Sequence, residues 1–259
     1  MHLLIIDAMN LIPRMYAAMP EHDSKEEACI NRCINTIADN AARLEATHCA
    51  IVFEKKEPTW RHAVWPDYKL GRSPMPESLE KSLGDFKKGF NTAGYFCFEY
   101  PNWEADDVIA SLASKAALNS VNSTIISTDK GFFQLVNCRI QVLNHFDRQL
   151  FNEEEVQARY SIKPKQLNDL LALTGDTTNH LPGVKGVGIK TATDLLSQHQ
   201  DLDTLLVQLP NLTLKPKLTE ALENHWRSAL LTRKLATLVT DLPLNINLND
   251  MRLNAKTII

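Results

Sequence analysis

The stretch Tyr100-Pro-Asn-Trp-Glu-Ala-Asp-Asp-Val-Ile-Ala-Ser-Leu-Ala113 places three carboxylates at the start of an apolar-periodic run. Apolar residues recur at helical spacing over 108–116, which predicts that Glu104, Asp106 and Asp107 lie in the first turn of a helix. One acid there is ordinary, because the helix dipole is positive at that end. Three acids repel one another and exceed what capping requires. A hard cation such as Mg2+ would cancel that repulsion, provided that other carboxylates reach the same place.

Short apolar runs alternate with helical patterns on both sides of this helix. We expect strands over residues 2–6, 48–53, 95–99, 123–128 and 139–144, and a long helix over residues 25–44. Strands that alternate with helices predict an α/β fold with a mostly parallel sheet covered on both faces.

Acidic residues follow three of the expected strands, namely Asp7, Glu54 and Asp129. Parallel strands present their carboxyl ends along one edge, where open α/β sheets bind ligands, and the helix after Glu104 begins at that same edge. Each acid taken alone is a common turn residue. Six acids at one edge are instead typical of a Mg2+ or Mn2+ site that activates water and stabilises charge on phosphate. The candidate metal ligands are Asp7, Glu54, Glu104, Asp106, Asp107 and Asp129.

The remaining segments are of two kinds. Residues 55–91 are rich in Lys and Pro and predict no strand, whereas the pattern from Glu153 onward is all-helical, with helices expected over 164–173 and 191–198. Between these two helices lies Gly175-Asp-Thr-Thr-Asn-His-Leu-Pro-Gly-Val-Lys-Gly-Val-Gly-Ile-Lys-Thr191. Its glycines allow tight turns, and the amides that open the second helix can bind a phosphate. Ile189 stands where a nucleotide P-loop requires Lys, which excludes a P-loop, but a purely structural turn remains an alternative.

Composition narrows the class of protein. The 259 residues show no secretory pattern at the N-terminus and no run of 18 apolar residues, so we expect a cytoplasmic protein without membrane insertion. Five cysteines without a CxxC pair argue against disulfides and zinc, and fit a reducing compartment. The net charge of −3 does not by itself indicate a nucleic-acid binder.

Taken in order, several short motifs resemble those of the bacterial 5′-3′ exonuclease/flap endonuclease family over nearly the whole chain. They are Asp7-Ala-x-Asn10, Trp60-Arg-His62, Tyr68-Lys-Leu-Gly-Arg72 followed by Pro74-Met-Pro76, Glu104-Ala-Asp-Asp107, Ser127-Thr-Asp-Lys-Gly131 and Leu181-Pro-Gly-Val-x-Gly-Val-Gly-x-Lys190. The resemblance implies a PIN-like nuclease core over residues 1–160, with a helical arch near residues 55–91. It also implies a helical C-terminal region over residues 161–259 that contains a helix–three-turn–helix motif.

The resemblance also implies roles for single residues. In family members the helix–three-turn–helix binds duplex DNA backbone through a K+ ion held by main-chain carbonyls. The K+ ligands carried over are Leu173, Thr174, Pro182, Val184 and Val187. The DNA contacts carried over are Gly186, Val187, Gly188, Ile189, Lys190 and Thr191. The catalytic residues are expected to be Asp106, as a metal ligand, and Lys69 and Arg72, which would reach from the arch base toward the scissile phosphate.

The chain departs from the family pattern at several acids. Glu54 replaces the usual Asp after the second strand and is expected to reach metal through water. A second metal site normally uses three aspartates, whose positions here are Gly131, Asp176 and Asn179. Because charge count governs affinity for hard cations, we expect one tight Mg2+ site and a weak or absent second one.

Three functions remain open from the sequence. The favoured one is a monomeric Mg2+-dependent flap endonuclease that acts on branched or flapped DNA. One alternative is a DNA-structure-binding protein whose nuclease activity is weak or lost. Another is a PIN-type ribonuclease, which the glycine-rich motif disfavours because it suits duplex backbone rather than bases.

Overall fold

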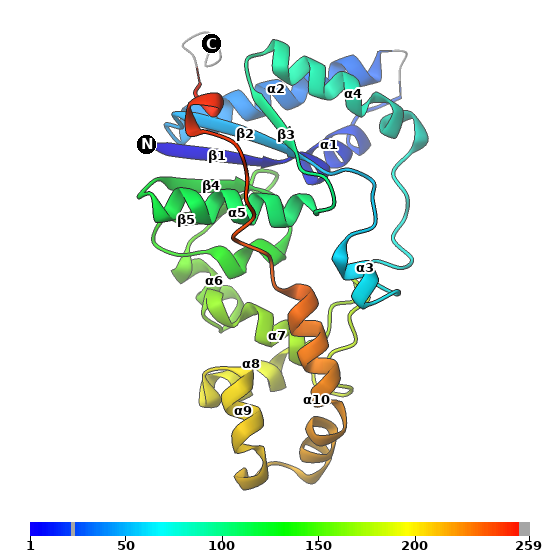
Figure 1. The fold of residues 1–259 in the computed structure, drawn as a ribbon, viewed down its shortest axis with the longest axis vertical. Helices are drawn as coiled ribbons and strands as arrows, with labels where there is room; N and C mark the ends of the chain where they lie inside the picture. Colours follow the sequence, from blue (N-terminus) through cyan, green and yellow to red (C-terminus); the bar gives the residue numbers. More distant parts are fainter. Residues whose placement is uncertain (22–23, 254–259) are drawn as a thin grey trace.

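The computed structural model describes residues 1–21 and 24–253, and in them six strands form one sheet of order β3-β2-β1-β4-β5-β6 (Figure 1). The strands are β1 (His2–Asp7), β2 (His48–Phe53), β3 (Phe96–Glu99), β4 (Asn122–Ile126), β5 (Ile140–Asn144) and β6 (Gln149–Phe151). All neighbours pair in parallel except β5 and β6. The expectation of a mostly parallel sheet is therefore confirmed, while the short antiparallel strand β6 was not predicted.

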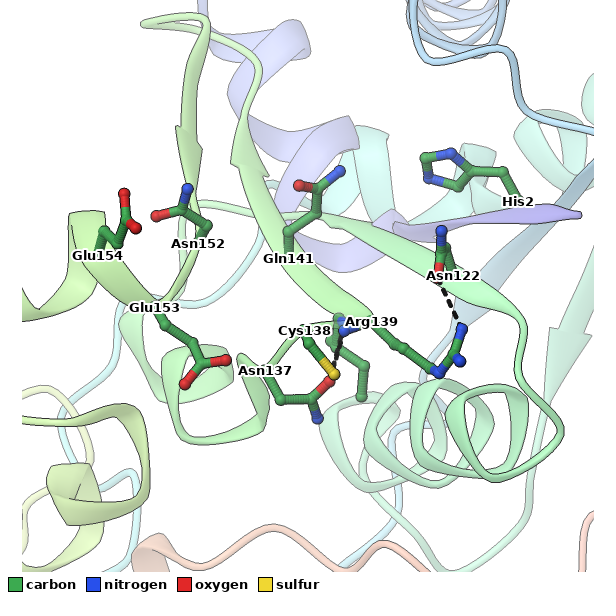
Figure 2. A pocket seen from close by; sticks show the side chains of 10 residues that line it. His2, Asn122, Asn137, Cys138, Arg139, Gln141, Asn152, Glu153 and Glu154 are labelled. Carbon is green, nitrogen blue, oxygen red and sulfur yellow. Dashed lines mark hydrogen bonds between the residues drawn. The ribbon is translucent and has the colours of Figure 1, made fainter.

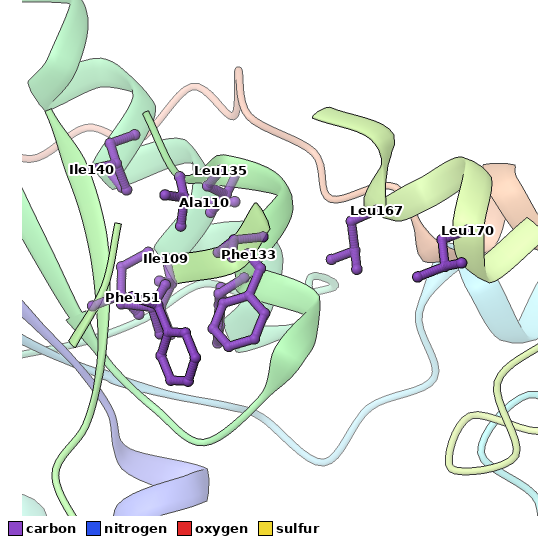
Figure 3. Packing of buried hydrophobic residues seen from close by; sticks show 14 of the residues in the cluster. Ile109, Ala110, Phe133, Leu135, Ile140, Phe151, Leu167 and Leu170 are labelled. Atoms are coloured by element: carbon purple, nitrogen blue, oxygen red, sulfur yellow. The ribbon is translucent and has the colours of Figure 1, made fainter. Parts of the chain in front are cut away.

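The sheet is buried on both faces, as its continuous apolar strands require. Successive side chains of a strand point to opposite faces, so Leu3 and Ile5 join one core and Leu4 and Ile6 join the other. Helix α5 (Ala105–Leu118) contributes to the first core, and α1 (Ala8–Ala17), α2 (Lys25–Arg43) and α4 (Glu77–Thr92) contribute to the second. Figure 3 shows the first core, where α5 side chains meet those of the segment that follows β4.

Helix α5 is mostly buried, although Lys115 and Leu118 near its C-terminus are exposed, and its sequence explains how closely it approaches the sheet. Ala105, Ala110 and Ala113 expose no more than 1% of their surface, and their short side chains leave room for the strands beneath. Glu104 is the N-cap residue, so the first turn of α5 begins just past the carboxyl end of β3. This placement puts the acidic first turn at the carboxyl edge of the sheet.

Residues 55–91 contain no strand, in agreement with expectation, but include α3 (Trp60–Val64) and most of α4. Thr59 and His62 cap α3 reciprocally, because the Thr59 amide donates to His62 Nδ1 at 3.1 Å. An irregular segment then leads from α3 to α4 (Figure 1).

The C-terminal half is helical up to Ala236, as expected from Glu153 onward, but residues 237–247 form no helix and depart from that expectation. It comprises α6 (Glu153–Tyr160), η2 (Pro164–Gln166), α7 (Leu167–Thr174), α8 (Ile189–His199), α9 (Leu202–Gln208), η3 (Leu209–Asn211), α10 (Pro216–Ala236) and η4 (Leu248–Met251). The segment after α10 then runs back along α5 to the sheet (Figure 1), where the Leu253 amide donates to the Thr47 carbonyl at 3.0 Å. We refer to residues 237–253 as the C-terminal strap.

No helix in the described part of the chain is both long enough and apolar enough to cross a membrane.

Candidate functional site

The order of the strands creates a switch point between β1 and β4, since β2 and β3 lie on one side of β1 and β5 and β6 lie beyond β4. Open α/β sheets bind ligands at such points, at the carboxyl ends of the strands. Asp7 ends β1, and Asp129 follows β4 in a short loop before the 3-10 helix η1 (Lys130–Leu135). Both acids therefore flank the switch point.

Ser127 links these two acids directly. Its hydroxyl donates to Asp7 Oδ2 at 2.8 Å and accepts from the Asp129 amide at 3.0 Å. The other Asp7 oxygen accepts from the Asn10 amide at 3.0 Å, which caps α1. Asn10 in turn accepts hydrogen bonds at 3.0 Å from the amide and the hydroxyl of Thr128. The loop after β4 is thus fixed against the start of α1.

Asp106 in the first turn of α5 belongs to the same electrostatic group. Burial raises the pKa of Asp106 well above its usual value, and the charges of Asp129 and Asp7 raise it further, while Lys69 opposes them. The pKa of Asp7 is raised to about 7, chiefly by burial and also by Asp129 and Glu54, although hydrogen bonds from Ser127 and Asn10 oppose the shift. Like charges near one another disfavour ionisation. Asp7, Asp106 and Asp129 therefore act on one another electrostatically, and Glu54 acts on Asp7 and Glu104 on Asp106 in the same way.

Glu104 lies beside this group but is occupied by other partners. Its carboxylate accepts from Tyr68 Oη at 3.1 Å and Thr59 Oγ1 at 3.2 Å, and it lies 3.2 Å from Lys69 Nζ and 3.4 Å from Arg61 Nη1. Burial alone would raise the pKa of Glu104, but the positive charges of Lys69 and Arg61 outweigh it and lower that pKa. Glu104 is therefore a buried anion that anchors the Tyr68–Lys69 segment.

Glu54 occupies a different position, at the N-terminus of α5. Its Oε2 accepts from the Ala105 amide at 3.3 Å, and this is a favourable place for a carboxylate because the helix dipole is positive there.

Asp107 is turned to a separate network. Its two oxygens accept from Arg61 Nη1 and Nη2 at 2.6 and 2.8 Å, and one of them also accepts from the Val239 amide at 2.9 Å. Arg61 also donates to the carbonyls of Leu235 and Thr237. Burial works to lower the pKa of Arg61, but Asp107 outweighs it and the pKa is raised. The structure therefore commits Asp107 to a buried ion pair instead of bringing it to the Asp7–Asp129 group.

Across the described ranges, no three His, Cys, Asp or Glu side chains converge closely enough to form a ready-made metal site. The six predicted acids lie at the expected edge but fall into different roles. Asp7, Asp106 and Asp129 form the electrostatic group, Glu54 caps α5, and Glu104 and Asp107 form ion pairs with basic side chains.

The segment that carries the predicted basic residues is attached to the turn between α7 and α8. Lys69 has a left-handed backbone, with φ of 58°, and its amide donates to the Asn179 carbonyl at 3.0 Å. Arg72 Nη2 donates to Asn179 Oδ1 at 2.7 Å, and its Nε donates to the Thr178 carbonyl at 3.3 Å. Lys69 thus points toward the acids, whereas the Arg72 head group lies on the turn.

Asp176, the acid retained from the second metal motif, is engaged within that turn. It accepts from the Thr178 amide at 2.9 Å and from Asn179 Nδ2 at 2.5 Å. At the other motif position, a Cβ on Gly131 would lie 3.1 Å from Asp129 Oδ1, a tight contact. Of the three positions of the second metal motif, only Asp176 therefore carries a carboxylate, and that carboxylate is bonded within the turn.

The predicted K+ ligands come from two segments that the structure brings together. Residues 173–176 and 181–184 form a short antiparallel bridge, in which the Val184 amide donates to the Leu173 carbonyl at 2.9 Å. A Cβ on Gly183 would lie 2.2 Å from the Gly175 nitrogen, so only glycine permits this approach. Among the predicted DNA contacts, Ile189 exposes 65% of its surface, and Gly186 and Gly188 have open space around them.

Several residues of the site received no role from the sequence, although the motifs contained them. Arg61, Tyr68, Asn10 and Ser127 all hold acids or loops in place through hydrogen bonds. The spacing Asp7-x-x-Asn10 is that of a helix N-cap and could have identified the bond from the Asn10 amide to Asp7, but not the contact of the Asn10 side chain with Thr128. Nothing in the local sequence pairs Arg61 with an acid 46 residues away.

A cavity of about 310 Å³ lies at the opposite edge of the sheet. Figure 2 shows His2, Asn122 and Gln141, from the beginnings of β1, β4 and β5, around it. Arg139 is held there by Asn122 Oδ1 at 3.3 Å. This cavity is remote from the acids and does not contribute to the site.

Comparison with known proteins gives a consistent result along the chain. A family model described as 5′-3′ exonuclease, N-terminal resolvase-like domain, matches residues 2–161, and one described as 5′-3′ exonuclease, C-terminal SAM fold, matches residues 162–258. Flap endonuclease Xni of Colwellia psychrerythraea is 38% identical over 273 residues, which cover 99% of this chain and 93% of the relative. Flap endonuclease Xni of Shewanella oneidensis is 41% identical over 257 residues, with coverage of 98% and 96%.

Solved structures share the fold at lower identity. T5 5′-exonuclease with bound zinc ions has a TM-score of 0.79 and 20% identity, covering 93% of this chain and 90% of that protein. The catalytic core of Rad2 in complex with a DNA substrate has a TM-score of 0.60 and 15% identity, covering 90% and 77%. At these identities the likeness concerns the fold alone.

Proposed function

The chain belongs to the 5′-3′ exonuclease family of DNA-hydrolysing flap nucleases, as its motifs predicted. On that premise we propose that it is a structure-specific flap endonuclease. It cuts phosphodiester bonds near the 5′ flap of branched DNA in a Mg2+-dependent reaction. The observation that carries the proposal is the chain of contacts from Asp7 through Ser127 to Asp129 at the switch point, with Asp106 beside it.

These acids fit a hard divalent cation. Their donors are carboxylate oxygens, which Mg2+ and Mn2+ prefer. Burial and mutual repulsion disfavour the ionised forms of Asp7 and Asp106, and a cation among them would offset both effects. Asp7, Asp106 and Asp129 would hold it, and Glu54 and Glu104 would add negative charge beside it. Asp107 does not fit, since Arg61 occupies both of its oxygens.

The basic residues act on the substrate. When bound, the cation supplies activation of water and neutralisation of charge on the phosphate. Lys69, whose Nζ lies 3.2 Å from Glu104 Oε2, exchanges this partner for the scissile phosphate and offsets negative charge that develops there. Arg72 gives up its hydrogen bond to Asn179 and contacts the same phosphate as Lys69.

The stoichiometry of Mg2+ follows from the acids that remain. Gly131 and Asn179 carry no charge, and Asp176 is already bonded to Asn179, so we expect one tight site and a weak or absent second one. Isothermal titration calorimetry with Mg2+ in the absence of DNA should show one tightly bound Mg2+ per chain. Two Mg2+ ions bound with equal affinity would contradict the assignment of a single tight site.

DNA binding is assigned to the helical region. We place the nuclease core at residues 1–160 and the helical region at residues 161–259. In the latter, carbonyls of Leu173, Thr174, Pro182, Val184 and Val187 hold K+, and residues 186–191 contact the duplex backbone. The exposure of Gly186, Gly188 and Ile189 beside the buried Val184 and Val187 supports this arrangement.

A labelled 5′-flap substrate tests the function. Wild-type protein should release the flap only when Mg2+ is present, and should cut the flapped duplex faster than single-stranded DNA. Asp106→Ala should abolish cleavage while retaining or strengthening DNA binding, because a charge that repels phosphate is removed. Asp85→Ala, which removes an exposed acid of α4, is the matched control and should cleave normally. Cleavage by Asp106→Ala near the parent rate would refute the metal assignment.

A further inference from the structure

A second, smaller cavity lies next to the acids. It has a volume of about 50 Å³ and is lined by Ser127, Thr128 and Lys130 after β4, Asn144 at the end of β5, and Arg159 and Tyr160 at the end of α6. Ser127 forms part of its wall and also donates to Asp7 and accepts from Asp129. The cavity and the acid group therefore share one residue, and a group bound in the cavity would be a close neighbour of a group bound at the acids.

The lining is cationic. Neither Lys130 nor Arg159 forms an ion pair with a carboxylate among the residues that the structure describes, and no acid lines the cavity. Lys130 Nζ and Arg159 Cζ each lie 5.9 Å from the centroid of the Tyr160 ring, so both cations approach the same aromatic side chain. Arg159 is directed by Gln149, whose Oε1 accepts from Nη1 at 2.7 Å.

The inner wall is fixed. Phe133 packs against Phe151 at 4.5 Å and against Tyr160 at 5.6 Å between ring centroids, and both phenylalanines are buried. The wall beneath the two cations is therefore formed by packed aromatic side chains.

We propose that this cavity binds a phosphate group of the substrate strand close to the scissile phosphate. The proposal rests on the flap-nuclease function above. Arg and Lys donors beside hydroxyl and amide groups are the chemistry that recognises phosphate oxygens. The same chemistry suits an internal phosphodiester or a 5′-terminal phosphate.

Substrates with one phosphate neutralised or removed distinguish an internal phosphodiester from the 5′-terminal phosphate. A flap substrate carries a methylphosphonate in place of one phosphate at a time, at positions around the cleavage site, and a further substrate lacks the 5′-terminal phosphate. Binding is measured by fluorescence anisotropy with EDTA present, so that the DNA stays intact. At one position the wild-type protein should lose about tenfold in affinity, as expected for a charge-assisted contact. The double variant Lys130→Ala/Arg159→Ala should lose less than about twofold at that same position.

Salt dependence gives an independent readout. Each lost phosphate contact should reduce the slope of log K against log salt by about one. Lys165→Ala, which removes an exposed lysine of η2 outside the cavity, is the matched control and should keep the methylphosphonate effect. Lys130 and Arg159 are exposed, so their replacement should leave the thermal unfolding temperature unchanged.

The outcomes are distinct. The proposal is supported if neutralising one phosphate weakens binding to the wild-type protein but not to the double variant. An effect at an internal position identifies the bound group as a phosphodiester, and an effect on removal of the 5′-terminal phosphate identifies it as that phosphate. An unchanged effect at every position in the double variant would overturn the proposal. Binding is measured without cleavage, so the comparison of the wild-type protein with the double variant does not depend on nuclease activity. Failure of the wild-type protein to cut an unmodified flap would count against the proposed function alone.

Discussion

Lys69 combines two features that favour a role in turnover. Its left-handed backbone, with φ of 58°, costs about 1–2 kcal/mol for any residue with a Cβ, and such strain is concentrated at functional sites. Its ammonium group pairs with Glu104, whose other partners Tyr68, Thr59 and Arg61 hold the carboxylate in place. The lysine can therefore leave Glu104 without leaving a buried carboxylate unpartnered.

Lys69→Ala should lower kcat by on the order of 10²–10³ with a smaller change in KM, since the contact strengthens in the transition state. Alanine keeps the Cβ and the same backbone strain, so the substitution isolates the ammonium group. Single-turnover and steady-state kinetics on a 5′ flap provide the measurement. Lys88→Ala, at an exposed lysine of α4, is the control. A change confined to KM would instead indicate uniform phosphate binding.

The acids show which properties of single residues can be read from the sequence. The position of Asp7 and Asp129 at strand ends followed from the strand pattern and the rule for parallel sheets. The pairing of Asp107 could not be predicted in this way, because its partners Arg61 and Val239 lie 46 and 132 residues away in the sequence. Local sequence predicts where an acid lies, whereas remote packing decides what it binds.

At the scale of elements, the turn between α7 and α8 was foreseen from its glycines. Gly175 and Gly183 have positive φ values of 76° and 62°, and they allow the two segments of the turn to touch. The antiparallel strand β6 and the strap were not predicted. Strand β6 has only three residues, and the strap alternates apolar and polar residues at Leu242, Leu244 and Ile246 but forms neither a strand nor a helix there. Their positions are set by tertiary contacts, such as those of Ser111 Oγ with the Val239 carbonyl and the Leu242 amide.

The same turn predicts an effect of monovalent cations on DNA binding. Asp176 is the only acid between Leu173 and Val187, and it is bonded to Thr178 and Asn179, so carbonyl oxygens must supply a cation site. Neutral carbonyls suit K+, which would add one positive contact to the DNA backbone. Replacing K+ with Na+ or Li+ should therefore weaken binding to duplex-containing substrates.

Anisotropy titrations in the three salts check this, at fixed ionic strength because any salt screens phosphate contacts. Single-stranded oligonucleotides are the control and should show little preference among the ions. Equal duplex affinity in all three salts would leave Lys185, Lys190 and the amides of α8 as the whole anchor.

At the scale of the molecule, the helical region and the sheet are joined by the strap and by Arg61. The strap contacts α5 through Ser111 and Lys115, and Tyr100 Oη donates to the Pro243 carbonyl. Arg61, 1% exposed, connects α3 to Asp107 of α5 and to the carbonyls at the end of α10. Because α5 also carries Asp106, the position of this metal-ligand candidate depends on contacts made far from it.

A double-mutant cycle on Arg61 and Asp107 tests this connection. Arg61→Met leaves the buried Asp107 without a basic partner, and Asp107→Leu leaves Arg61 with only its longer ion pair to Glu104, at 3.4 Å. Each change alone should therefore lower the free energy of unfolding by about 3–5 kcal/mol. The double variant should lose much less than the sum of the two, since no isolated charge remains. Urea unfolding provides the free energies. The pair of the half-buried Arg233 and the exposed Asp203 is a matched control, because it also joins two helices through two hydrogen bonds. Asp203→Ala should cost only about 0.2–1 kcal/mol, as is usual for exposed ion pairs.

Additive losses in the Arg61 and Asp107 variants would show that the two side chains stabilise the protein independently, and that the buried pair does not couple the helical region to α5.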